Sequence, residues 1–121
     1  MHHRFNHIEL VTDDTRKARD FYAALFRWQF TEMPSPVPGG VYTYIHTGEG
    51  ATGGLVQKAM PQAPNAWLSY VLVENVADTL TAALTRGGTV VVPQTAVPTG
   101  AFAVLADPTG AVFGVFEDTR K

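Results

Sequence analysis

The turn Asp107-Pro108-Thr109-Gly110 joins two strand-like runs, residues 101–106 and 111–117. Asp, Pro and Gly stand at the first, second and fourth turn positions, where each is favoured, so the segment is predicted to be a β-hairpin. An earlier segment has the same plan: a run at 41–46, the turn Thr47-Gly48-Glu49-Gly50, and a second run at 51–57. The hairpin therefore occurs twice in the chain.

The two hairpins share residues as well as a plan. Val37, Pro38, Gly40, Gly50, Ala51 and Gly54 return, each sixty positions later, as Val97, Pro98, Gly100, Gly110, Ala111 and Gly114. Chance would give about two matches in segments of this length. Similar composition of two hairpins is the alternative explanation. We interpret the match as an internal duplication because the rest of the chain repeats too.

Each hairpin is preceded by a strand, a helix and another strand. In the first half, residues 5–11 alternate as a half-buried strand does. Thr12–Thr15 can cap a helix that continues to about Arg27. Its apolar stripe, predicted to be core, is Ala18, Phe21, Tyr22, Leu25 and Phe26. Residues 28–33 are predicted to form a strand and 34–40 a loop, because prolines and glycines interrupt regular structure.

The second half follows a connector at residues 61–65. We predict a strand at 67–73, a helix capped by Asn75 and ended by Gly87-Gly88, a strand at 89–92 and a loop at 93–100. The stripe of this helix, also predicted to be core, is Val76, Leu80, Ala83 and Leu84.

Each half is thus predicted to be β-α-β-β-β. The expected fold is α+β: two βαβββ repeats, about residues 4–60 and 66–118, form a curved mixed sheet with the helices on its outer face. The whole chain, 1–121, is expected to be one domain. A small ligand would lie in the concave cup of the sheet.

The composition limits the function further. The net charge is −2 and no basic run is present, so nucleic acid is not an expected partner. Cysteine is absent, which excludes disulfides and thiolate chemistry. No signal peptide or membrane-spanning run is visible, so a cytoplasmic protein is expected.

The chain resembles the vicinal oxygen chelate (VOC) superfamily, which includes glyoxalase I, bleomycin-resistance proteins and extradiol dioxygenases. The resemblance covers nearly the whole chain. Its carriers are Asn6–Val11 with Asp13, Phe21-Tyr22 and Leu25, the strand ending at Asn75, Leu84 with Gly87-Gly88, and residues 102–116 around the Asp107 turn. The resemblance implies the cup-shaped fold and a homodimer.

Enzymes of this family hold a divalent metal through four strand positions, two in each half. By resemblance these positions fall on His7, Ser69, Gly54 and Gly114. Only His7 is a normal ligand, so the resemblance implies that no metal is held at these positions. Glu9, His46, Gln57 and Glu117 are other side chains that could contribute to a displaced site, and His7, Gln57 and Glu117 form the alternative ligand set. Gln57 and Glu117 follow the glycines by three residues, so strand alternation is expected to point them to the opposite face.

His7 and Glu9 are predicted to line the pocket together. They could act as a general base and its partner, or His7 could be an inherited histidine satisfied by its neighbours. Tyr42, Tyr44 and His46 alternate on one strand and must share a face. That face is either the cup, where the three would form an aromatic wall with a polar tip, or the surface under the helix. Ser69 completes the set of expected ligand-binding residues.

Two functions compete. The first is a glyoxalase- or bleomycin-resistance-like protein that binds a small organic molecule in the cup without the family metal. The alternative is a metal-dependent lyase, isomerase or dioxygenase that uses His7 and a displaced ligand set to hold zinc, nickel, manganese or iron. An acid–base enzyme that uses His7 and Glu9, and an interaction module with a filled cup, are the remaining hypotheses.

Overall fold

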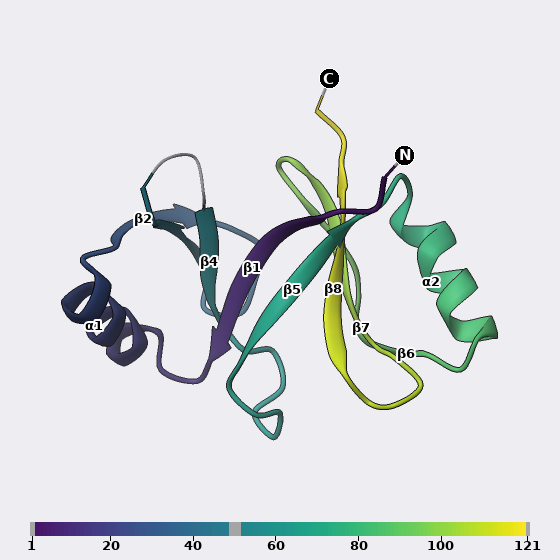
Figure 1. Ribbon diagram of the computed structural model, residues 1–121, viewed down its shortest axis with the longest axis horizontal. Helices are drawn as coiled ribbons and strands as arrows, with labels where there is room; N and C mark the ends of the chain where they lie inside the picture. Colours follow the sequence, from purple (N-terminus) through teal and green to yellow (C-terminus); the bar gives the residue numbers. More distant parts are fainter. Residues whose placement is uncertain (1, 49–51, 121) are drawn as a thin grey trace. The chain divides into compact units, whose positions relative to one another are not determined.

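The computed structural model describes residues 2–48 and 52–120, and Figure 1 shows how they follow one another. The chain divides into two units. One contains residues 7–67, and the other contains residues 2–6 and 68–120. We call them the N-terminal unit and the C-terminal unit. Both follow the order β-α-β-β-β, so the predicted pair of βαβββ repeats with a glyoxalase-like fold is confirmed.

The N-terminal unit has a four-stranded mixed sheet covered by α1. Its elements are β1 (Phe5–Thr12, from His7 onward), α1 (Thr15–Phe26), β2 (Gln29–Pro34), β3 (Val41–His46) and β4 (Thr52–Gln57). The strand order is β1-β4-β3-β2, with β1 parallel to β4 and the other pairs antiparallel. Leu10, Ile45 and Leu55 form the core under the helix, with Ala18 and Tyr22 packed against it.

The C-terminal unit repeats this arrangement. Its elements are β5 (Ala66–Leu72, from Leu68 onward), α2 (Val76–Thr85), β6 (Thr89–Val97), β7 (Gly100–Ala106) and β8 (Val112–Asp118). The order is β5-β8-β7-β6, with β5 parallel to β8. Its core is larger and contains Val73, Val76, Ala101, Ala103, Leu105 and Val115.

Both helices begin at side-chain caps. The Asp14 carboxylate accepts from the Lys17 amide at 2.9 Å, and the Asn75 side chain accepts from the Asp78 amide at 2.8 Å. Each bond satisfies an amide that has no partner within the helix. At the end of α2, Gly87 takes φ +90° and the Gly88 amide donates to the Ala83 carbonyl at 2.9 Å. The predicted roles of Asn75 and of the glycine pair are confirmed.

Two predictions of local structure are wrong. Residues 93–97 continue β6 rather than begin a loop. β6 is the edge strand, and its pairing with β7 shifts register between Val90 and Thr95. Pro93 lies within this irregular stretch, where the lack of a backbone N–H is tolerated. The stripes of the two helices are also not all core. In α1, Phe21 is 58% exposed, Leu25 56% and Phe26 52%, and in α2 Leu84 is 54% exposed. The first hairpin turn falls partly on residues 49–51, which lie outside the described residues.

Candidate functional site

The face of the N-terminal sheet opposite α1 carries the predicted ligand-binding residues other than Ser69. In β3, Thr43 and Ile45 are buried on the side of the helix, so alternation places Tyr42, Tyr44 and His46 on the other side. In β1, Leu10 belongs to the core under α1, which puts His7 and Glu9 on the opposite side as well. We call this set, His7, Glu9, Tyr42, Tyr44 and His46, the tyrosine face. The arrangement under the helix is therefore excluded for the two tyrosines.

The side chains of the tyrosine face interact with one another. His7 Nε2 lies 2.5 Å from Tyr42 Oη, a hydrogen bond between β1 and β3. The Tyr42 and Tyr44 rings meet edge to face with centroids 5.1 Å apart. At the exposed end, His46 Nε2 and Thr31 Oγ1 are 2.8 Å apart. Glu9 is buried and pairs with Gly54 across the sheet. Thr31 was not among the residues expected from the sequence.

Burial lowers the pKa of His7 below its ordinary value, because the charged imidazolium loses contact with water. At neutral pH His7 is therefore an uncharged imidazole. An uncharged ring can accept a hydrogen bond at one nitrogen, and Nε2 is placed to accept the Tyr42 hydroxyl proton. The pair forms a neutral polar unit within an aromatic surface.

This pKa shift predicts a pH-dependent stability. The unfolded chain takes up the His7 proton near pH 6.5, whereas the folded chain resists it to lower pH. The free energy of unfolding should therefore fall as the pH drops below about 6.5. Urea titrations at pH 7.5 and 5.0 measure it. In the His7→Gln variant the loss should be smaller, whereas His46→Gln, which removes an exposed histidine of the same face, should keep it. An equal loss in wild type and His7→Gln would contradict the assignment.

Gly54 lies beside the His7–Tyr42 pair and is one of the four positions that the resemblance assigns to the metal. A Cβ built there would overlap the Tyr42 hydroxyl and lie 2.8 Å from His7 Nε2. Tyr42 therefore occupies the space that a ligand side chain at position 54 would need.

Gly114 in the C-terminal unit has the same relation to Tyr70. A Cβ at Gly114 would overlap the Tyr70 ring, with which Gly114 pairs in register. Tyr70 is 3% exposed and its ring centroid lies 6.3 Å from that of Phe102. The sequence analysis did not select Tyr70. Its signal is a large aromatic residue paired across two strands with a glycine.

The strand registers correct one equivalence between the halves. Glu9 pairs with Gly54 and Tyr70 pairs with Gly114, so Tyr70 is the counterpart of Glu9. The counterpart of His7 is then Leu68, two residues earlier, rather than Ser69. Ser69 is exposed and alternates with Val71 and Val73, which pack with the α2 core. Ser69 therefore lies on the helix side of β5.

The alternative ligand set is not brought together. Gln57 follows Leu55 by two residues, which places it on the α1 side of β4, opposite His7. Glu117 follows Val115 on the α2 side of β8, and its Oε1 accepts from the Val76 amide at 2.9 Å. The expected orientation of Glu117 away from the glycine face is confirmed. Glu117 holds the first turn of α2.

This contact predicts a structural role for Glu117. Glu117→Ala should lower the free energy of unfolding by about 2 kcal/mol, since it leaves a helix amide without its charged acceptor. Glu117→Gln retains an acceptor oxygen and should cost less than half as much. Urea denaturation measures both. A Glu117→Ala variant as stable as wild type would refute the role.

The chemistry of these positions does not fit the metal that the family implies. His7 is a ligand type, but its Nε2 is bonded to Tyr42, and the other positions are Gly54, Gly114 and Leu68. Zinc and its relatives need at least three protein donors in a catalytic site. Within residues 2–48 and 52–120, no three His, Asp or Glu side chains are grouped as a metal site requires. No step of a mechanism can be derived through a metal here.

The fold and these residues identify the class of protein. The chain belongs to the glyoxalase/bleomycin resistance protein/dioxygenase superfamily, whose sequence profile matches residues 4–115. CFP32 of Mycobacterium tuberculosis, which its name assigns provisionally to the glyoxylases, is 34% identical over 110 residues, covering 90% of this chain and 42% of that protein. Anthracycline biosynthesis protein DauV of Streptomyces sp. strain C5 is 32% identical over 126 residues, covering 89% and 44%. The chain thus spans less than half the length of these relatives.

Solved structures show the same fold at lower identity. Hypothetical protein BH1468 from Bacillus halodurans superposes with a TM-score of 0.67 at 12% identity, covering 98% of this chain and 96% of that one. A glyoxalase I mutant from Zea mays gives 0.64 at 21% identity, covering 94% and 43%. The described helices are too short or too polar to cross a membrane.

Proposed function

We propose that this chain binds a small organic molecule on the tyrosine face without the family metal. The observation that carries the proposal is the Tyr42 hydroxyl, which bonds His7 Nε2 and occupies the space beside Gly54. The nitrogen that would hold a metal is engaged, and the position that would supply a second ligand has no side chain. The surface that remains is suited to recognition by contact and hydrogen bonding.

The side chains of the face favour a planar, amphipathic ligand. Tyr42 and Tyr44 are half-buried and offer ring surface, while His46 and Thr31 form a polar end. One ligand with an aromatic body and a polar tip would use both. The name of the relative DauV connects that protein with anthracycline biosynthesis, and anthracyclines are planar, polycyclic and polar at one end. An anthracycline is therefore a rational first probe.

The test is a fluorescence and calorimetric titration with daunorubicin and simpler hydroxyquinones, with EDTA and then with added zinc, nickel or manganese. We expect saturable binding that is unchanged by EDTA. Tyr44→Ala should weaken binding at least tenfold, because base-like stacking on one aromatic ring contributes about 1–3 kcal/mol. Phe21→Ala, which removes an exposed ring from α1, is the matched control and should bind as wild type does. Binding that requires metal would overturn the proposal and favour a metal-dependent enzyme.

The proposal also includes a homodimer, which the family resemblance led us to expect for a chain of this length. Sedimentation velocity across a hundredfold range of concentration measures the assembly. Sedimentation as a monomer throughout the range would remove this part of the proposal and leave the ligand site standing.

A further inference from the structure

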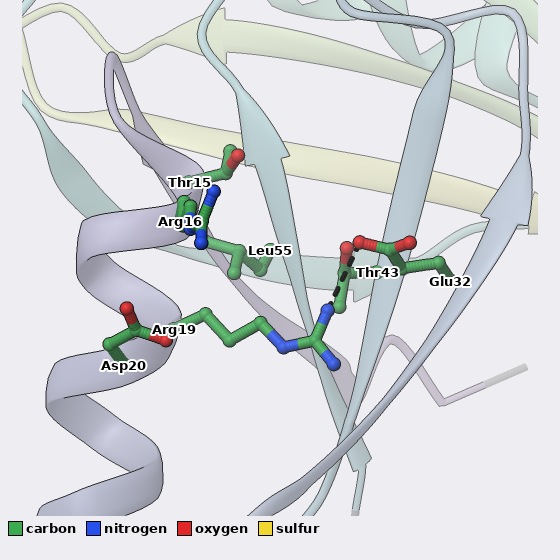
Figure 2. Close-up of a pocket in the computed structure, with 7 residues that line it drawn as sticks. All are labelled: Thr15, Arg16, Arg19, Asp20, Glu32, Thr43 and Leu55. Carbon is green, nitrogen blue, oxygen red and sulfur yellow. Dashed lines mark hydrogen bonds and ion pairs between the residues drawn. The ribbon is translucent and has the colours of Figure 1, made fainter.

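A second hollow lies on the other side of the N-terminal sheet, under α1. Its volume is about 400 Å³, within the usual range for small-molecule pockets. Figure 2 shows the residues that line it: Thr15, Arg16, Arg19, Asp20, Glu32, Thr43 and Leu55. All seven belong to the N-terminal unit. Because Thr43 faces α1 and the tyrosine face lies opposite, this cavity is separate from the site described above.

Thr43 is the residue that indicates a ligand. The residue as a whole is 5% exposed and lies on β3 against the cavity, and its hydroxyl oxygen is not among the described side-chain atoms that are both enclosed and without a partner, so it can be reached from the cavity. A hydroxyl that lines a cavity can donate a hydrogen bond to a bound molecule and can also accept one. A ligand in the cavity would give this hydroxyl a partner.

Arg19 is already positioned across the same cavity. Figure 2 shows its side chain extending from α1 toward Glu32 and Thr43. One guanidinium nitrogen donates to Glu32 Oε2 at 3.0 Å, and the guanidinium carbon lies 5.2 Å from the centre of the Phe30 ring. A guanidinium has five N–H donors, so this ion pair orients the group and leaves most of its donors available.

The start of α1 adds positive potential. Its first turn contains no acidic residue but does contain Arg16, which forms no ion pair with any residue in the described ranges. The Asp14 carboxylate already caps this end of the helix, so the attraction for an anion comes from the Arg16 cation. Arg16 and Thr15 line the cavity from this end.

We propose that the cavity binds a small monocarboxylate. A planar carboxylate matches the guanidinium of Arg19 and can accept from the Thr43 hydroxyl and from Arg16. Asp20 and Glu32 also line the cavity, and their charges balance the two arginines. With no net positive charge in the lining, the cavity compensates a single carboxylate charge better than the double charge of a phosphate. The apolar side chain of Leu55 leaves room for a short hydrocarbon body.

The test compares sodium propionate with propionamide, its neutral isostere, and with phosphate at equal ionic strength. Two-dimensional ¹⁵N NMR should show saturable shifts at the Thr15, Arg19 and Thr43 amides with propionate, and at least tenfold weaker effects with the other two. Equal responses to propionate and propionamide would overturn the proposal. So would a complete absence of saturable shifts with propionate, and a stronger response to phosphate would reject the carboxylate.

Variants distinguish binding in the cavity from a general effect of the positive charge on α1. Arg16→Gln and Thr43→Val should each weaken propionate binding at least fivefold. Thr43→Val is nearly isosteric and should keep the fold, which its Tm and its ¹⁵N spectrum in the free state check. Lys17→Gln is the matched control: it removes a charge from the same helical turn, but Lys17 does not line the cavity. A Lys17→Gln effect equal to that of Arg16→Gln would contradict the site. Daunorubicin binding should be unaffected by all three changes, which distinguishes failure here from failure on the tyrosine face.

Discussion

Gly114→Ala is expected to lower the free energy of unfolding by about 3 kcal/mol, the upper part of the usual range for an overpacked core. The added Cβ would overlap the Tyr70 ring and lie 2.6 Å from its Cζ. Tyr70 is 3% exposed and its ring is packed beside Phe102, so it has no room to turn away. Urea denaturation followed by tryptophan fluorescence measures the effect.

Gly54→Ala is the matched comparison in the other repeat. Its Cβ meets the hydroxyl end of Tyr42, which is half-buried and can move toward solvent. We expect a cost of about 1 kcal/mol, together with loss of the His7–Tyr42 hydrogen bond. In a Tyr70→Leu background, Gly114→Ala should lower the free energy of unfolding by less than it does in the wild-type protein. If Gly114→Ala costs no more than Gly54→Ala, the ring overlap does not determine the stability.

These overlaps connect the absent metal ligands with the packing. A glutamate at position 54 or 114 would need the same space as the alanine Cβ, and more. Regaining a ligand at position 114 would therefore require loss of Tyr70, and at position 54 it would require Tyr42 to move away from His7.

The fold was predictable because the hairpin occurs twice. The repeat also paired Gly54 with Gly114, and the strand registers place the two glycines at equivalent positions of the two units. The alternation of Tyr42, Tyr44 and His46 showed that they share a face. It did not show which face, because apolar and aromatic side chains suit both the core and a ligand surface.

The alignment of the two halves was wrong by one residue at the first strand of each half. Ser69 was aligned with His7, but the register assigns Leu68, and a shift of one residue moves a side chain to the other face of a strand. Tyr70 was missed for the same reason. The cavity beneath α1 could not be predicted from the sequence either. Strand alternation indicates that Thr43 and Ile45 share a face of the sheet, but it does not show whether the helix fills the space above them.

The exposed stripe of α1 leads to the last prediction, that α1 opens more readily than α2. None of the α1 residues is fully buried, and the helix contacts its core through Ala18 and Tyr22. In α2, Val76 is completely buried and Leu80 and Ala83 pack on the larger core. Fewer buried apolar contacts give a smaller free energy of local opening.

Hydrogen exchange measures this difference directly. After correction for intrinsic rates, the hydrogen-bonded amides of α1 should exchange at least tenfold faster than those of α2, equivalent to about 1.4 kcal/mol. Tyr22→Ala should accelerate exchange in α1 and leave α2 unchanged. Because a ligand stabilises the conformation that it binds, saturating propionate should slow exchange in α1, while propionamide should not. Equal protection of the two helices in the free protein would show that the aromatic contacts of Tyr22 with Trp28 and Trp67 hold α1 as firmly as the core holds α2.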